Sequence, residues 1–199
     1  PRALAYSTAE SGIFLAVRYL QKRQPSIRIA VIGLGAGSIA SYARESDTVD
    51  FYEINPEVIR IAQEYFSFLK ECKGKTNLLL GDGRLKLDAN EGTLYDMIIL
   101  DAFTGGSVPV HLLTQEAFQI YQKRLAVNGF IVAHATNSYL NLYPVIKRQA
   151  EELEMSFRCH FVPFDKEKFI RKNFYMCLTN DPTYLTETVN LYPPIYDSE

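Results

Sequence analysis

Short apolar runs alternate with amphipathic segments along the chain, and this order constrains the fold more than any other feature. The apolar runs are IRIAVIGLG (27–35), VDFYEI (49–54), TNLLL (76–80), YDMIILD (95–101) and GFIVAHAT (129–136). Their length and apolar character are typical of buried strands. Helix-period segments lie between them, such as residues 55–69, where Asn55 fits the N-cap and Pro56 the first helical position.

Two further apolar runs, SFRCHFVPF (156–164) and NFYMCLTN (173–180), follow near the end of the chain. A short charged connection links them, which predicts an antiparallel hairpin. Further helices are expected over residues 11–23, 36–44, 114–125 and 141–154. The predicted fold class is therefore α/β, an open and mostly parallel sheet with helices on both faces and a C-terminal antiparallel hairpin.

Composition and charge exclude several classes of function. The formal net charge of -2 offers no general footprint for nucleic acid or an anionic membrane. No apolar run approaches the roughly 20 residues of a membrane span, and the start shows no secretory signal. Cys72, Cys159 and Cys177 lie far apart without a CxxC pair, which predicts buried free thiols in a reducing compartment. Because the chain starts at Pro1 rather than Met, we expect a fragment or a processed chain.

The ends of four predicted strands carry the residues that point to function. Ligands of open α/β sheets bind outside the carboxyl ends of the strands, near the point where the strand order reverses. These ends hold the glycine loop at 33–37, Glu53, Asp82 and Asp101. In the loop GLGAGS, glycines let the backbone turn sharply and approach a ligand, and the helix that follows offers free N–H groups.

The spacing of the loop glycines, Gly33, Gly35 and Gly37, favours a nucleoside that carries a sulfonium over NAD. A dinucleotide site would have glycine or alanine at position 38, where this chain has Ser38. The alternative interpretation is a glycine-lined turn that only packs the helix on the strand.

Two carboxylates follow at the ends of the next strands. Glu53 lies twenty residues after Gly33, an offset at which a carboxylate accepts both hydroxyls of a ribose, in NAD and in S-adenosyl ligands alike. Asp82, within GDGR, is placed to accept the exocyclic amine of adenine, and its flanking glycines let the base lie close. The alternatives are a solvated carboxylate for Glu53 and a turn aspartate bonded to its own backbone for Asp82.

Asp101 ends an apolar run that is expected to be buried on both faces. A carboxylate at the mouth of such a sheet is partly desolvated, so it requires a cation or hydrogen-bond donors to face. The histidines His111, His134 and His160 are further candidates. His160 lies mid-strand and is interpreted as structural. His134 lies near the end of the fifth strand and His111 in the loop after Asp101, and for both a packed or solvated side chain is the favoured interpretation.

The motifs at these strand ends together resemble a known family. The chain resembles the spermidine synthase-like (polyamine aminopropyltransferase) branch of the S-adenosylmethionine methyltransferase fold in VIGLGAGS, FYEINPEVIRIA, GDGR, YDMIILDAFTGGSVPVHLLT and AHATN, over about residues 6–137. The resemblance implies a Rossmann-like class I methyltransferase fold that binds S-adenosylmethionine or its decarboxylated form, releases methylthioadenosine and requires no metal. The implied nucleoside-binding residues are Gly33, Gly35, Gly37, Glu53, Ile54, Asp82, Gly83 and Asp101.

The resemblance further implies that Asp101 holds the amine substrate and helps to remove its proton. The attacking nitrogen must be neutral, whereas a free amine is protonated at neutral pH, so a positioned carboxylate would orient the ammonium and accept its proton. Ser11 resembles a residue that borders the amine site, and His111 would line a lid, so both are candidate substrate-binding residues.

The chain departs from this family in two places. Spermidine synthases carry a second aspartate three residues after the first, where this chain has Thr104, which we retain as a candidate catalytic residue beside Asp101. Only a short segment precedes the first predicted strand, where the family has an N-terminal β-domain. Both departures weaken the prediction of a polyamine substrate more than they weaken the prediction of the nucleoside site.

Other hypotheses stay open beside an aminopropyltransferase: a small-molecule S-adenosylmethionine-dependent methyltransferase, and a non-catalytic nucleoside- or amine-sensing domain of a membrane protein. Ser38 and the terminal hairpin disfavour an NAD enzyme. We expect a small-molecule amine as partner, no nucleic acid and a cytoplasmic location. A homodimer and a tether to a membrane domain of a longer protein are alternatives that the sequence does not decide. The expected organisation is an N-terminal helical segment (1–25), a nucleoside-binding Rossmann-like domain (26–180) and a C-terminal tail (181–199).

Overall fold

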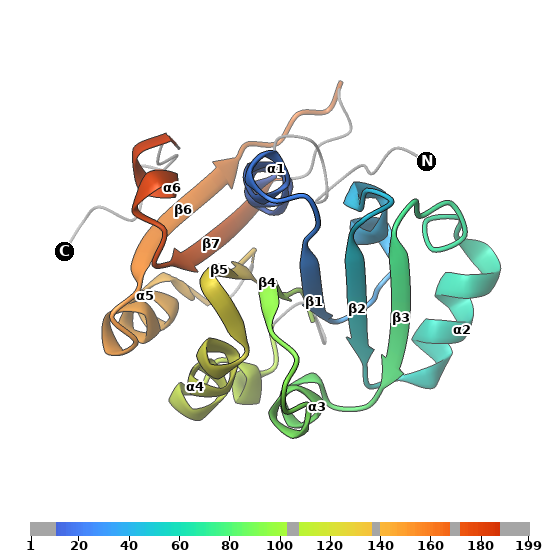
Figure 1. The fold of residues 1–199 in the computed structure, drawn as a ribbon, viewed down its shortest axis with the longest axis horizontal. Helices are drawn as coiled ribbons and strands as arrows, with labels where there is room; N and C mark the ends of the chain where they lie inside the picture. Colours follow the sequence, from blue (N-terminus) through green and yellow to red (C-terminus); the bar gives the residue numbers. More distant parts are fainter. Residues whose placement is uncertain (1–10, 103–107, 137–139, 168–171, 188–199) are drawn as a thin grey trace.

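A seven-stranded sheet forms the centre of the molecule, in the order β3-β2-β1-β4-β5-β7-β6 (Figure 1). The computed structural model of the chain describes residues 11–102, 108–136, 140–167 and 172–187. The strands are β1 (Arg28–Ile32), β2 (Thr48–Glu53), β3 (Lys75–Leu80), β4 (Tyr95–Leu100), β5 (Leu125–His134), β6 (Ser156–Val162) and β7 (Asn173–Thr179). The first five strands are parallel, and β7 pairs antiparallel with both β5 and β6. The predicted open sheet with a terminal antiparallel hairpin is therefore confirmed.

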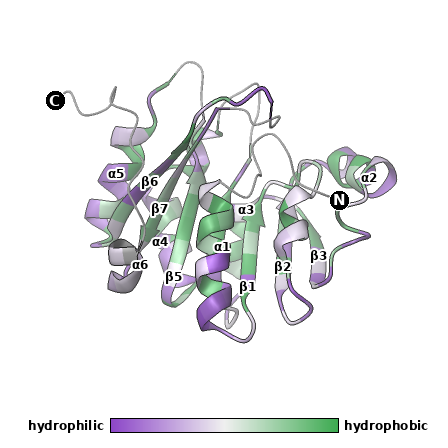
Figure 2. Ribbon diagram, turned by 90° about the horizontal axis from the view of Figure 1, so that it is seen from above, coloured by the Kyte–Doolittle hydropathy of each residue, from purple (hydrophilic) through white to green (hydrophobic). Residues whose placement is uncertain are grey.

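Helices cover both faces of the sheet. Those that pack on one face are α1 (Gly12–Arg23), the 3₁₀ helix η1 (Ser38–Tyr42), α2 (Pro56–Tyr65) and α6 (Pro182–Glu187). Those that pack on the other are α3 (Gly83–Ala89), the 3₁₀ helix η2 (Val110–Leu112), α4 (Gln115–Lys123) and α5 (Tyr143–Glu152). Figure 2 shows the hydrophobic residues concentrated along the central strands.

Each face of the sheet builds its own apolar core. In β1, Ile29 and Val31 belong to the core beneath α1, while Ala30 and Ile32 belong to the core beneath α3 and α4. A strand that is buried on both faces has no solvated side on which to place polar residues. This explains why the central strands are continuous apolar runs in the sequence.

Side-chain caps define where two of the predicted helices begin. Asn55 accepts a hydrogen bond from the backbone N–H of Glu57 (2.9 Å), and Pro56 lies in the first turn of α2, as predicted. Thr114 caps α4 in the same way through the N–H of Ala117 (3.3 Å). Helices α3 and α6 are not among those expected from the sequence.

Two segments differ from the expected helices. The helix expected over residues 36–44 is the short 3₁₀ helix η1. Ala62 is the only buried residue of α2, whereas Tyr65 is 72% exposed. The apolar face of this helix is therefore largely exposed. α2 lies at the outer margin of the sheet beside the edge strand β3 (Figure 1), so only part of its apolar face finds a packing surface.

The predicted tail begins as a packed helix. Tyr184 of α6 is fully buried, and its ring centroid lies 4.9 Å from that of Tyr19 in α1 and 4.7 Å from that of Phe130 in β5. The hydroxyl of Tyr19 also donates to Oδ2 of Asp181 (2.7 Å). Asp181 and Tyr184 therefore attach the start of the predicted tail to α1 and the sheet. Residues 188–199 of that tail lie outside the described residues.

Two expectations from composition can be compared with the structure. Within the described ranges, no helix combines the length and apolar character needed to span a membrane. Cys72, Cys159 and Cys177 are free, as predicted; Cys159 and Cys177 are also buried, whereas Cys72 is only partly buried. Burial raises the pKa of the Cys159 and Cys177 thiols to about 12, so both stay protonated at neutral pH.

Candidate functional site

The carboxyl ends of β1 and β4 lie side by side at the point where the strand order reverses. From β1 the chain builds β2 and β3 on one side and then β4 and β5 on the other. Backbone hydrogen bonds continue past the strands, from Gly33 N to Tyr52 O (2.8 Å) and from Asp101 N to Ile32 O (2.9 Å). The predicted strand ends are thus fixed at one edge of the sheet, where open α/β sheets bind ligands.

The first two glycines of the loop have different surroundings. Gly33 has a φ of +99°, and a Cβ at this position would lie 2.7 Å from the carbonyl oxygen of Asp101 and 2.9 Å from Cα of Ala102. Gly33 therefore allows the end of β1 to approach the end of β4. Gly35 has a φ of +53°, and no atom lies within 4 Å of the position that its Cβ would take. The loop thus has a packed side at Gly33 and an open side at Gly35.

The third glycine, Gly37, precedes η1 with a φ of +79°. Its Cβ would lie 3.0 Å from Cγ of Leu69, in the segment that follows α2. This position therefore also packs against the protein, and Gly35 alone of the three faces open space.

Glu53 is bonded to the glycine loop rather than solvated at a strand end. Its Oε2 accepts from the N–H of Leu34 (3.0 Å) and its Oε1 from the N–H of Asn55 (2.9 Å), and the residue is buried. Each carboxylate oxygen keeps a further lone pair for another donor. Ile54 follows Glu53 and is 67% exposed, so it offers an apolar surface beside the carboxylate.

Asp82 caps α3 with one oxygen and faces His111 with the other. Oδ1 accepts from the N–H of Leu85 (3.0 Å), so the local-turn interpretation of Asp82 holds for that oxygen. Oδ2 lies 3.6 Å from Nε2 of His111, whose side chain is 49% exposed. Gly83 is buried at the start of α3, where a Cβ would lie 2.8 Å from Cγ2 of Ile32.

The short helix η2 carries His111 to Asp82. The hydroxyl of Tyr121, in α4, donates to the carbonyl oxygen of Leu112 (3.1 Å) and anchors this helix. Burial raises the pKa of Tyr121, so the hydroxyl remains a donor at neutral pH. His111 is thereby placed beside the predicted adenine-binding carboxylate, whereas the sequence suggested only that it follows Asp101.

Asp101 lies at the end of β4 with a side chain that is 25% exposed. Its Oδ1 lies 2.6 Å from Nδ1 of His134, and Nε2 of the same ring lies 2.9 Å from Oγ1 of Thr136. His134 is only 4% exposed, and its ring is stacked on Tyr175 with 4.4 Å between the ring centroids.

The link between Asp101 and His134 was missed in the sequence analysis. A signal for it exists in the strand order, because β4 and β5 are parallel neighbours in which Leu100 pairs with Ala133. The next residue of each strand is Asp101 and His134, so their side chains meet one step beyond the last pair. Finding this contact from sequence would require the register of β4 on β5.

The remaining predicted site residues lie elsewhere. Ser11 is buried and caps α1, because its Oγ accepts from the N–H of Phe14 (3.2 Å). The adjacent Gly12 packs on the sheet, where a Cβ would lie 2.7 Å from Cβ of Tyr175. Thr104 lies outside the described residues. A role for Ser11 in binding an amine stays a prediction.

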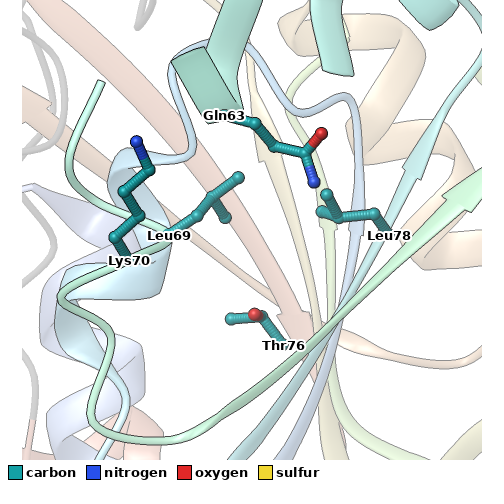
Figure 3. Close-up of a pocket in the computed structure, with 5 residues that line it drawn as sticks. All are labelled: Gln63, Leu69, Lys70, Thr76 and Leu78. Carbon is teal, nitrogen blue, oxygen red and sulfur yellow. The ribbon is translucent and has the colours of Figure 1, made fainter. Parts of the chain in front are cut away.

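A cavity of about 430 Å³ lies between the segment around α2 and the edge strand β3 (Figure 3). Its lining residues are Gln63, Leu69, Lys70, Thr76 and Leu78. None of the predicted site residues lines this cavity, so we base the site on the contacts at the strand ends. In the described part of the chain, no three His, Cys, Asp or Glu side chains gather in a way that could hold a metal ion.

Comparison with known proteins gives sequence relatives of one kind. The polyamine aminopropyltransferase of Vibrio vulnificus is 39% identical over 121 residues, which are 58% of this chain and 40% of that protein. The polyamine aminopropyltransferase of Clostridium botulinum is 28% identical over 137 residues, 64% of this chain and 47% of that protein. The chain thus spans less than half of the length of these relatives. No protein-family model matches the chain.

Solved structures share the fold. A probable spermidine synthase from Corynebacterium glutamicum superposes with a TM-score of 0.66 and 20% identity, covering 84% of this chain and 62% of that one. Human methyltransferase-like protein 13 in complex with SAH superposes with a TM-score of 0.63 and 18% identity, covering 92% of this chain and 93% of that one. A spermidine synthase in complex with the transition state analogue AdoDATO superposes with a TM-score of 0.59 and 16% identity, covering 84% of this chain and 62% of that one. The chain is thus a sequence relative of the polyamine aminopropyltransferases and has the class I methyltransferase fold, as its motifs predicted.

Proposed function

We propose that this domain binds an adenosyl sulfonium nucleoside and transfers its aminopropyl group to an amine, with Asp101 as the amine-binding base. One observation carries the proposal: the partly exposed Asp101 carboxylate stands beside the glycine loop at the switch point of the sheet. The similarity to polyamine aminopropyltransferases, at 39% identity over 121 residues, supports the choice of reaction.

The donor nucleoside would lie along the carboxyl ends of β1, β2 and β3. The open space at Gly35 lets a ligand approach the backbone of the loop. Glu53, held in place by Leu34 and Asn55, would accept the ribose hydroxyls through its remaining lone pairs. Asp82 would accept the adenine amine at Oδ2, and the exposed Ile54 would pack on the base.

The chemistry of the transfer assigns a simple role to Asp101. The ammonium of the acceptor loses a proton to the carboxylate, which frees the nitrogen lone pair. That lone pair forms the new N–C bond at the propyl carbon, the C–S bond breaks, and its electrons convert the sulfonium into the neutral thioether of methylthioadenosine. The new secondary amine leaves as an ammonium, and the proton held by Asp101 returns to solvent.

Methyl transfer to a small molecule is the second candidate function. The observation that favours it is the fold shared with methyltransferase-like protein 13, which was solved in complex with SAH and superposes with a TM-score of 0.63. The two reactions would use the same nucleoside pocket and differ in the group beside the sulfonium.

Thermal-shift measurements with S-adenosylmethionine, its decarboxylated form and methylthioadenosine distinguish these functions. A ligand at about a hundredfold excess over its Kd adds about 2.7 kcal/mol of stability, which raises the Tm of a domain of this size by about 5–10 °C. Preference for the decarboxylated donor, with product formed from an amine, supports aminopropyl transfer. Preference for S-adenosylmethionine, with a methylated product, supports methyl transfer. Binding without turnover supports a sensing domain. If none of the three nucleosides binds, the nucleoside site is refuted.

Asp101→Asn tests the base directly. The amide cannot accept the proton of the ammonium, so we expect turnover to fall at least about a hundredfold while the nucleoside-induced thermal shift is retained. Asp96→Asn is the matched control, because Asp96 lies at the opposite end of β4 and its Oδ2 accepts from the backbone N–H of Arg28 (2.7 Å). Full turnover in the Asp101 variant would refute the assignment of the base.

A further inference from the structure

A line of hydrogen bonds runs from the backbone of β7 to the carboxylate of Asp101. The N–H of Phe174 donates to Oγ1 of Thr136 (2.8 Å), and this oxygen lies 2.9 Å from Nε2 of His134. The other ring nitrogen, Nδ1, lies 2.6 Å from Oδ1 of Asp101. Three neighbouring strands, β4, β5 and β7, thus contribute to one line of donors and acceptors.

This line indicates which nitrogen of His134 carries the proton. A threonine hydroxyl has one proton to donate. The carboxylate of Asp101 requires a proton on Nδ1, so in a neutral ring Nε2 is the unprotonated nitrogen and accepts the hydroxyl proton of Thr136, whose oxygen accepts from the backbone N–H of Phe174. Nδ1 carries the ring proton and donates it to Asp101, whose ionised carboxylate only accepts.

Packing holds the imidazole in this orientation. The ring is stacked on Tyr175 with an angle of 25° between the two planes, and His134 is buried. Tyr175 is in turn backed by the first turn of α1, where Gly12 leaves no room for even a methyl group. Turning the His134 ring over would break the hydrogen bonds to Asp101 and Thr136, and the tight packing behind Tyr175 opposes such a movement.

We propose that His134 is a positioning residue of the amine site: it donates from Nδ1 to Oδ1 of Asp101, and so directs Oδ2 to the substrate ammonium. Oδ2 has no protein hydrogen-bond partner among the described residues. A neutral imidazole leaves the pair with the single negative charge that attracts an ammonium, whereas an imidazolium would cancel that charge. The inference deepens the proposed function and rests on it for its kinetic consequences, but not for the state of the ring.

The proton movements follow from this arrangement. Oδ2 of Asp101 accepts the proton of the ammonium, while Nδ1 of His134 keeps its own proton and continues to donate to Oδ1. Nε2 does not receive a proton, because its lone pair accepts from Thr136. His134 therefore orients the base without becoming the base.

Nitrogen NMR of the wild-type chain tests the state of the ring without any turnover. In a neutral imidazole the protonated and unprotonated nitrogens resonate far apart, whereas in an imidazolium both resonate as protonated nitrogens. The chain has three histidines, so replacing His111 and His160 one at a time assigns His134 by elimination. At neutral pH we expect Nδ1 to be the protonated nitrogen, and a protonated Nε2 would overturn the proposal.

Thr136→Val and Thr136→Ser provide a matched pair for the same measurement. Valine removes the hydroxyl that donates to Nε2, so the resonance of this unprotonated nitrogen should shift, while Nδ1 still faces Asp101 and stays protonated. Serine retains the hydroxyl and should retain the wild-type spectrum. An unchanged Nε2 resonance in the valine variant would show that Thr136 does not donate to Nε2, and would contradict the proposed line of hydrogen bonds.

His134→Asn and His134→Gln test the link to Asp101 in the reaction. The amide nitrogen of asparagine can take the place of Nδ1 and keep the donor to Asp101, whereas the longer glutamine places its amide near the position of Nε2. Loss of a hydrogen bond to a charged group predicts a fall in kcat of about 10- to 100-fold for the glutamine variant, and about threefold or less for the asparagine variant. The nucleoside-induced thermal shift should be the same in both.

His160→Asn is the control for loss of a buried histidine, since His160 is bonded to Tyr184 rather than to Asp101. Equal losses of kcat in the asparagine and glutamine variants of His134 would overturn the positioning role. If the chain turns over no amine at all, the proposed function fails, while the NMR measurements still decide the state of His134.

Discussion

Gly33→Ala should destabilise the whole domain, because the new methyl group has no space. Its Cβ would lie 2.7 Å from the carbonyl oxygen of Asp101 and 2.9 Å from the backbone N and Cα of Ala102. These are backbone atoms of the neighbouring strand end, so no side chain can move aside to relieve the overlap. The φ of +99° adds a second cost, because L-residues rarely adopt it.

The size of the effect can be estimated from these two terms. Overpacking costs about 1–3 kcal/mol, and a non-glycine residue in such a backbone conformation costs about 1–3 kcal/mol more. We therefore expect the free energy of unfolding to fall by about 4 kcal/mol. For a domain of this size that loss lowers the Tm by about 8–16 °C.

Gly35→Ala is the matched control, two residues further along the same loop. No atom lies within 4 Å of its Cβ position, so only the backbone cost of its φ of +53° remains, about 1–2 kcal/mol. Thermal and urea unfolding followed by circular dichroism measures both variants. A Tm for Gly33→Ala equal to that of Gly35→Ala would refute the argument that close approach of β1 to β4 requires glycine. Gly35→Ala should instead weaken the nucleoside-induced thermal shift, because its methyl group enters the space proposed for the ligand.

Two further changes have defined outcomes. Asp82→Ala removes the cap of α3 and should cost about 1 kcal/mol in urea unfolding, whereas Asp82→Asn keeps a capping oxygen and should cost little; equal losses would contradict the capping role. Burial lowers the pKa of His160 to about 4 from 6.5, so the folded state binds fewer protons than the unfolded state between these values. This part of the stability is fully present above pH 6.5 and falls by about 3 kcal/mol as the pH drops to 4. In urea unfolding over this pH range, His160→Gln should show a smaller loss than wild type, and an equal loss would contradict the prediction.

Local sequence signals were sufficient for most elements of the fold. Apolar runs identified all seven strands of the sheet, and Asn55 and Thr114 marked the starts of α2 and α4. These signals work because backbone hydrogen bonding and burial on both faces impose a short-range pattern of residue types. The same pattern did not predict how exposed α2 is, because periodicity identifies an apolar face but not whether a sheet lies beneath that face.

The sequence by itself determined the class of fold, the family resemblance and which strand ends carry Glu53, Asp82 and Asp101. Only the tertiary structure decided which side chains meet there. His111 faces Asp82, and His134 bonds to Asp101 from a position 33 residues away, because β5 lies next to β4 in a fixed register. Strand order and register arise from packing of the whole chain, so a contact between two strand ends leaves no mark on the local pattern of either strand.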